Sequence, residues 1–246
     1  MISRKPEQLF TASPTPALGP RSTARESHEG RVTRMLEVAT QVIARSGYEG
    51  ASMRAIATAC RMSLAGLYHY FDSKEKILFL IQFRAFSSLL QNLKEKLHGV
   101  EDPVEQLRVM VRSHVGHFVE NMAALKVCSH ELDSLSGEAY EDTRRIRRQY
   151  YRLTRGIIDR VLDDGVPGDP SDRHVAAMSL FGTLNWLYRW YDPKRGPSSN
   201  AVANQIVDQF LCGVLNGARS VGNRVPRRDR RPARKALETS AGGRGD

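Results

Sequence analysis

The sequence predicts an all-α protein of about nine helices, arranged as a small N-terminal three-helix unit and a larger C-terminal helical bundle. Apolar residues recur every three or four positions from residue 30 to residue 217. Capping residues and helix-ending glycines separate these stretches, and the alternation of apolar and polar residues typical of a strand is not found. At 246 residues the chain is long enough for one or two domains with a substantial core.

The first helix is predicted over residues 30–46, and Gly47 would end it. Its apolar residues recur at helical spacing and would pack over the segment that follows. They are Val32, Met35, Leu36, Ala39, Val42 and Ile43.

Two short helices follow, separated by a tight turn at residues 61–62. Ser52 would cap the first, over residues 53–60, and Ser63 would cap the second, which ends near Tyr70. Leu67 and Phe71 would face inward. The outer surface is then left to Leu64, Ala65, Gly66, Tyr68 and His69. This is the layout of a helix-turn-helix, whose second helix meets base edges in the major groove of DNA.

A long helix is predicted next, with Asp72 as its N-cap, Glu75 completing a capping box, and its end near Leu97. It links the two parts of the chain, so a tilt of this helix would move the helix-turn-helix. Lys74 and the free backbone N–H groups at its start could hold a phosphate.

In order and spacing, these residues resemble the N-terminal signature of the tetracycline-repressor-type (TetR) regulators over residues 31–80. The matching positions are Ser52-Met53-Arg54, Ile56-Ala57, Met62-Ser63, Leu67-Tyr68, Tyr70-Phe71, Ser73-Lys74-Glu75 and Leu78. Two positions depart from the pattern. Arg61 stands where the family usually has glycine, which implies either backbone strain or a benign local geometry. Ala55 replaces an acidic residue that would complete a capping box with Ser52.

Two groups of residues are expected to contact double-stranded DNA. The base edges would be met by Leu64, Ala65, Tyr68 and His69. The phosphates would be met by Ser52, Arg54, Ser63, Tyr70 and Lys74. Arg21 and Arg25 in the N-terminal arm could also reach a groove, although an arm without DNA contacts is the favoured interpretation.

Further helices are predicted at residues 103–121, 125–132, 138–162, 171–191 and 199–217, with a loop at 165–170. Asp102, Pro103 and Glu105 form the capping pattern of the first of these. The last two helices are too apolar to face water alone, which predicts a homodimer. Resemblance to the TetR family implies pairing through these two helices in a four-helix bundle. Two-fold symmetry would then set the recognition helices about 34–36 Å apart on a near-palindromic operator.

The segment from Asn185 to Tyr191 contains both tryptophans, Trp186 and Trp190, with Arg189 between them. Aromatic rings beside a cation suit a flat π system that bears phosphates, whereas packing in a core or a dimer interface is the alternative. A similar segment occurs in TetR regulators that respond to acyl-CoA thioesters of fatty-acid or steroid catabolism. That resemblance implies an acyl-CoA effector, and the two interpretations stay open.

Other effector contacts are expected inside the bundle. His114 and Phe118 are candidate walls of an apolar tunnel, together with Met110, Met122, Leu125, Leu153 and Phe181. Core packing explains these residues equally well. Arg148 belongs to an arginine-rich stretch that could collect phosphates, and a solvated helix face is the favoured interpretation of that stretch. Its arginines are Arg144, Arg145, Arg147, Arg148, Arg152 and Arg155.

Metal binding and catalysis have little support. His114 and His117 have a spacing that can bind zinc, but no motif places the further ligands, even with His130 and Glu131 considered. Phosphate-binding glycine loops and nucleophile motifs are not found. We therefore expect no metal, no cofactor and no enzymatic activity.

Charge and composition suggest four segments: an N-terminal arm at 1–29, a DNA-binding domain at 30–76, an effector and dimerisation domain at 77–219, and a tail at 220–246. Half of the net charge of +10 resides in that tail, which could add phosphate affinity or act only as a solubilising end. Cys60, Cys128 and Cys212 are expected to be reduced core residues, and no apolar run reaches the length of a membrane span. These features predict a cytoplasmic protein.

The leading prediction is a TetR-type regulator, expected to be a repressor, that binds its operator as a homodimer and is released by a small effector. The alternative is a structural DNA-binding protein that coats DNA without sequence preference and without an effector.

Overall fold

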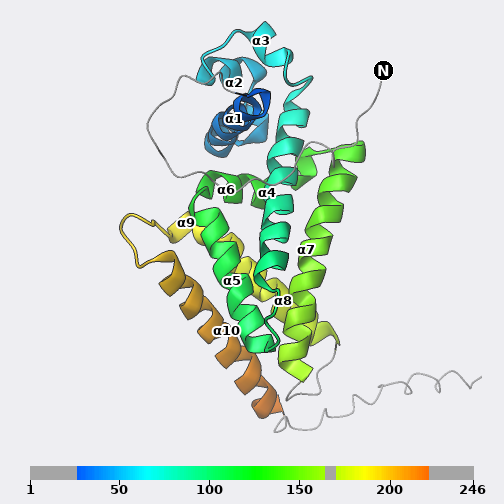
Figure 1. Cartoon of the computed structure of the whole chain (residues 1–246), viewed down its shortest axis with the longest axis vertical. Helices are drawn as coiled ribbons and strands as arrows, with labels where there is room; N and C mark the ends of the chain where they lie inside the picture. The colour runs from blue at the N-terminus through cyan, green and yellow to red at the C-terminus, as the bar shows by residue number, and fades with distance from the viewer. Residues whose placement is uncertain (1–26, 164–169, 222–246) are drawn as a thin grey trace, which may run out of the picture.

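The computed structural model of the chain describes residues 27–163 and 170–221, all of whose regular elements are helical (Figure 1). Three predicted segments lie wholly or largely outside the described residues. They are the N-terminal arm with Arg21 and Arg25, the loop at 165–170 and the basic tail. No strand occurs in the described part, which confirms the all-α prediction.

The N-terminal unit consists of α1 (His28–Gly50), α2 (Met53–Ala59) and α3 (Leu64–Tyr68). The first α-helix is kinked at Gly47, whose φ of 72° and ψ of 167° are not helical. Gly47 therefore interrupts the helix, as predicted, but the chain resumes a further turn beyond it. Ser52 and Ser63 cap α2 and α3 as predicted.

The long helix α4 (Lys74–Lys96) joins the two parts of the molecule. Its N-cap is Ser73, whose hydroxyl accepts the Lys76 N–H, so the prediction that Asp72 caps this helix is wrong. Glu75 does not complete a capping box either. It accepts hydrogen bonds from the backbone N–H and the hydroxyl of Ser136 at 2.7 and 2.8 Å.

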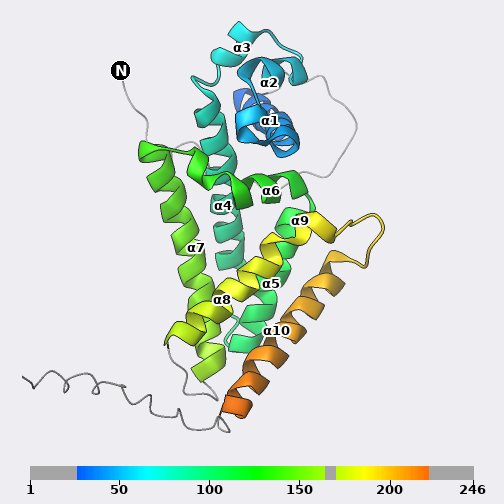
Figure 2. The same ribbon diagram turned by 180° about the vertical axis from the view of Figure 1, so that it is seen from behind.

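The remaining elements are α5 (Pro103–Val119), α6 (Met122–His130), the 3-10 turn η2 (Leu132–Ser134), α7 (Gly137–Asp163), α8 (Pro170–Asn185), α9 (Leu187–Trp190) and α10 (Ser199–Val221). Asp102 caps α5 as predicted. The helix predicted over residues 171–191 is wrong in one respect, because it breaks at Trp186 into α8 and α9. Figure 2 shows α8 crossing the bundle toward α9.

Two apolar cores hold these helices together, and α4 contributes to both. Ile77, Leu78 and Ile81 pack with α1, α2 and α3 in the first core. Leu89 and Leu93 pack with α5, α7, α8 and α10 in the second. The boundary proposed after residue 76 therefore falls inside α4.

The cysteines differ in exposure. Cys128 is buried, and burial raises the pKa of its thiol to about 12. Cys60 is half-buried, whereas Cys212 is exposed, so the prediction of a core position is wrong for Cys212. The reason is that α10 packs on α5 through the side that carries Val202 and Val207 and leaves its opposite side uncovered.

Candidate functional site

The turn between α2 and α3 fixes the angle at which α3 leaves the N-terminal unit. The Met62 N–H donates to the Ala57 carbonyl, and the Arg61 N–H donates to the Thr58 carbonyl, both at 3.0 Å. This pair of bonds is the Schellman motif, which requires a left-handed residue. Arg61 is that residue, with a φ of 56°. Of the two options left open for Arg61, the backbone adopts the strained one.

Helix α3 lies at one tip of the molecule (Figure 1). Ala65, Tyr68 and His69 are exposed there, with Tyr68 47% exposed. Leu64 differs, because it is half-buried against the first core. Gly66 is tightly placed: a Cβ atom at this position would lie 3.1 Å from the Ser63 Oγ. A larger residue would therefore press on the cap of α3.

The residues expected to contact phosphates surround this helix. The hydroxyls of Ser52 and Ser63 accept the N–H groups of Ala55 and Gly66 at 3.1 and 3.0 Å. Each hydroxyl keeps its own hydrogen for another acceptor. Arg54 is exposed at the start of α2.

Tyr70 and Lys74 already have partners within the chain. The Tyr70 ring stacks on His28, with 5.3 Å between ring centroids. The Lys74 Nζ donates to the Tyr48 carbonyl at 2.8 Å and lies 4.0 Å from the centroid of the Tyr48 ring. An ammonium has three N–H donors, so this bond leaves two for other acceptors.

The residues predicted to contact an effector do not fall in one place. His114 and Phe118 lie in the second core, 2% and 1% exposed. The His114 Nδ1 is 3.1 Å from the Tyr150 hydroxyl, and its Nε2 has no hydrogen-bond partner among the described residues. Burial, with a smaller effect from His117, lowers the pKa of His114 to about 3, so the ring is neutral at pH 7.

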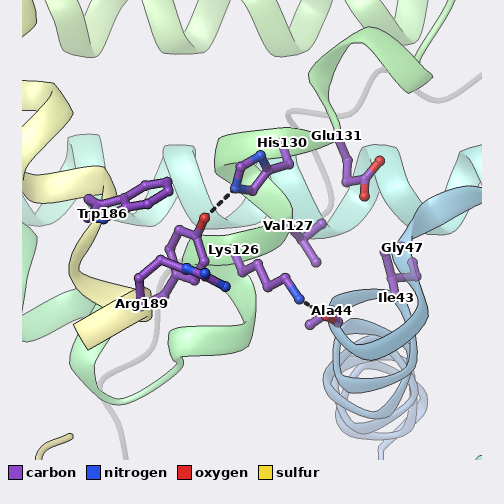
Figure 3. Close-up of a pocket in the computed structure, with 10 residues that line it drawn as sticks. Ile43, Ala44, Gly47, Lys126, Val127, His130, Glu131, Trp186 and Arg189 are labelled. Carbon is purple, nitrogen blue, oxygen red and sulfur yellow. Dashed lines mark hydrogen bonds between the residues drawn. The ribbon is translucent and has the colours of Figure 1, made fainter. Parts of the chain in front are cut away.

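Trp186 and Arg189 line a crevice between the N-terminal unit and the bundle (Figure 3). We call it the α1–α6–α9 crevice, and its volume is about 350 Å³. Its walls are Ile43, Ala44 and Gly47 from α1, Lys126, Val127, His130 and Glu131 from α6 and its C-cap, and Trp186, Tyr188 and Arg189 from the α9 segment. Arg189 lies over the Trp186 ring, 5.7 Å from its centroid.

The other predicted effector residues lie elsewhere. Asn185 is half-buried at the end of α8, and Trp190 is 56% exposed but is not among the residues that line the crevice. Arg148 lies on the outer face of α7, in a hollow of about 200 Å³ formed with Glu141, Arg144, Arg145, Gln149 and Arg152. Arg145 pairs there with Asp142 at 2.8 Å.

No group of three His, Cys, Asp or Glu side chains within 27–163 and 170–221 is placed to hold a metal ion. In the same ranges, no helix combines the length and the apolar character needed to cross a membrane.

Comparisons with known proteins identify the family. The family model described as "Bacterial regulatory proteins, tetR family" matches residues 35–81, and the model "Tetracyclin repressor-like, C-terminal domain" matches residues 100–214. A solved TetR-family transcriptional regulator from Bordetella parapertussis is 30% identical, with a TM-score of 0.72 over 77% of this chain and 98% of that one. This chain belongs to the TetR family.

Two other TetR proteins are similar over nearly their whole length. The HTH-type transcriptional repressor KstR2 of Rhodococcus jostii is 25% identical over 79% of this chain and 94% of its own. AibR, solved in complex with isovaleryl coenzyme A and operator DNA, is 28% identical, with a TM-score of 0.64 over 75% of this chain and 98% of its own. As a TetR protein, the chain is a transcriptional regulator with a DNA-binding helix-turn-helix and is not an enzyme.

Sequence reasoning missed Lys126 and Tyr188 in the wall of the crevice. Their partners are distant in sequence: the Lys126 Nζ donates to the Ala44 carbonyl, 82 residues away, and the Tyr188 hydroxyl pairs with His130, 58 residues away. Helical spacing relates only residues of the same helix, so no sequence pattern could have predicted contacts between these distant residues.

Proposed function

We propose that the chain is a cytoplasmic TetR-family repressor that binds a near-palindromic operator as a homodimer and leaves it when a small effector binds. The observation that carries the proposal is the Ser63-capped α3, which presents Ala65, Tyr68 and His69 at the tip of the molecule. The relative KstR2 is a transcriptional repressor, which supports repression. Base edges would be contacted by Leu64, Ala65, Tyr68 and His69, and phosphates by Ser52, Arg54, Ser63, Tyr70 and Lys74.

Exposed apolar residues on α8 support the homodimer. Val175 and Met178 are 60% and 49% exposed, one turn apart on the same face of the helix. Such neighbours on a regulator's surface are typical of an interface. Pairing through α8 and α10 would give the two-fold symmetry that a palindromic operator requires.

An acyl-CoA thioester is the effector that we propose. The chemistry of Trp186 and Arg189 suits a nucleotide head, and Asn185 and Trp190 are their neighbours in the chain. AibR, a relative, was solved with isovaleryl coenzyme A. His114 and Phe118 would meet the acyl part, since the His114 Nε2 is a buried polar atom without a partner among the described residues. Arg148 would collect phosphates from the outer face of α7.

One experiment tests these points together. An operator is first selected from random duplexes, and its binding is then measured by fluorescence anisotropy against a scrambled duplex at several salt concentrations. We expect the operator to bind at least about a thousandfold more tightly, and isovaleryl-CoA to release it. Equal affinity for both duplexes would favour the alternative, a protein that coats DNA without an effector.

A further inference from the structure

The kink of α1 lies directly beside the α1–α6–α9 crevice. In an uninterrupted helix the Tyr48 N–H would donate to the Ala44 carbonyl, four residues earlier. The backbone of Gly47 is not helical, and both groups have partners on α6 or its C-cap instead. The Tyr48 N–H donates to the Glu131 Oε1 at 3.1 Å, and the Ala44 carbonyl accepts from the Lys126 Nζ at 2.5 Å. The Lys126 bond is drawn in Figure 3.

These two bonds hold the end of α1 to the bundle. Two further contacts extend the joint to α4: the Lys74 Nζ donates to the Tyr48 carbonyl, and the Gln82 Nε2 donates to the Glu131 carbonyl at 2.9 Å. Because α4 begins close after α3, the orientation of the DNA-reading helix depends on this joint.

The crevice is lined by two cations, Lys126 and Arg189, that form no ion pair with a carboxylate in the described part of the chain. The partner of Lys126 is a neutral carbonyl, and Arg189 lies over the ring of Trp186. Glu131, the acidic residue of the wall, accepts hydrogen bonds from Tyr48 and from the Ser134 hydroxyl at 3.1 Å. Two of the three N–H groups of Lys126 remain for a ligand's oxyanion. Because an ammonium gains more from an anion than from a neutral carbonyl, such a ligand would draw the Lys126 Nζ away from Ala44.

The size of the crevice limits what can enter. Its volume of about 350 Å³ is near the lower end of the range for small-molecule sites. One flat ring with its anionic group fits this volume, whereas a whole acyl-CoA is too large for it. Trp186 is 53% exposed and can stack on such a ring.

We propose that this crevice binds the ring-bearing, phosphate-bearing head of the effector, and that Lys126 acts as the switch by exchanging the Ala44 carbonyl for the ligand's oxyanion. The proposal rests on the proposed function and adds how ligand binding in the crevice changes the position of the N-terminal unit. Once Lys126 turns to the ligand, the end of α1 loses one of the two bonds that hold it to α6 and its C-cap. Ligand and operator then weaken each other's binding by the same factor.

The test uses adenosine 5′-monophosphate as the probe, with adenosine and inorganic phosphate as its two separated parts. Binding to the full chain is followed by tryptophan fluorescence, which needs no DNA. We expect the intact probe to bind at least about tenfold more tightly than either part and to weaken operator binding. The absence of binding by the intact probe would overturn the proposal.

Variants of Lys126 separate the switch from simple charge attraction. Lys126→Met should weaken probe binding about tenfold, and it should also weaken operator binding without the probe, because Ala44 loses its partner. The operator affinity of this variant should no longer respond to the probe. Lys126→Arg keeps the positive charge and the N–H donors, so it should bind the probe and the operator as wild type does.

Lys94→Met, which removes a charge from an exposed position in the last turn of α4, is the matched control and should behave as wild type. A Lys126→Met variant that binds the probe as wild type does, or that still releases operator in response to it, would overturn the switch. If the chain prefers no operator at all, the proposed function fails instead, and the fluorescence titration still decides whether the crevice binds the probe.

Discussion

At the scale of single residues, the least expected feature is the arginine in the left-handed position of the α2–α3 turn. The Schellman bonds around Arg61 are complete, so the motif forms despite the residue and not because of it. A Cβ atom at this φ meets the following carbonyl, and the backbone stores that strain.

Arg61→Gly should relieve the strain. We expect the free energy of unfolding to rise by about 1 kcal/mol, since glycine adopts a φ of this sign without a steric penalty. Chemical denaturation measures the change. Arg61→Ala is the matched control because it removes the side chain but keeps the Cβ atom. Equal stabilisation by both variants would show that the guanidinium, and not the backbone, is responsible.

Buried His114 should make stability depend on pH. In the folded chain its pKa is lowered to about 3, mainly by burial, from an ordinary value of 6.5. Below pH 6.5 the His114 imidazole binds a proton in the unfolded chain but stays neutral in the folded chain. The free energy of unfolding should therefore fall with falling pH, by about 1.4 kcal/mol per pH unit from this group, until the pH nears 3.

Urea unfolding at several pH values between 6 and 4 checks this expectation. His114→Gln should show a shallower decline than wild type over this interval. His98→Gln, at an exposed position, serves as the matched control. A wild-type decline in His114→Gln would contradict the role of His114.

At the scale of elements, the start of α4 serves two purposes at once. Lys74 is proposed to contact a phosphate, and it also supports the end of α1 through Tyr48. Both roles predict weaker DNA binding when the side chain is lost, but they differ in their dependence on salt.

Lys74→Ala should weaken binding to operator and to random duplex alike. If Lys74 contacts a phosphate, the slope of log affinity against log salt should become shallower by about one unit. Anisotropy titrations from low to moderate salt measure this slope. An unchanged slope with reduced affinity would assign Lys74 to the support of Tyr48 alone.

Most elements could be predicted from the sequence because their signals are local. The serine caps of α2 and α3, the Asp102 cap and the glycine in α1 depend on neighbours a few residues away. The break at Trp186 could not be predicted, since residues 171–191 contain neither proline nor an internal stop other than Gly182. Packing of α9 against α6 accompanies that break.

The candidate site was less accessible to sequence reasoning than the fold. The segment with Trp186 and Arg189 was singled out by its composition, and it does line a crevice. The other wall, with Ala44 and Lys126, comes from helices distant in the chain. Predicted effector residues such as His114 and Arg148 lie in other places, because helical periodicity does not determine which faces of different helices meet.

At the scale of the whole molecule, the exposed apolar side chains of α8 lead to a prediction about assembly. Replacing both Val175 and Met178 by aspartate should give a folded monomer with much weaker operator binding, since charges oppose each other across a two-fold axis. Sedimentation velocity measures the mass, and circular dichroism checks the fold. Gln149→Asp, on the exposed face of α7, is the control. A variant that stays dimeric would contradict pairing through α8.

The double membership of α4 has a consequence for how the chain melts. Ile77, Leu78 and Ile81 complete one core, and Leu89 and Leu93 complete the other, on one uninterrupted rod of backbone. If one core unfolds its part of α4, the other core is disturbed as well. Heating should therefore give a single cooperative transition. A fragment that ends at residue 76 would lack the side chains that seal its interior, and it would remain unfolded when expressed alone.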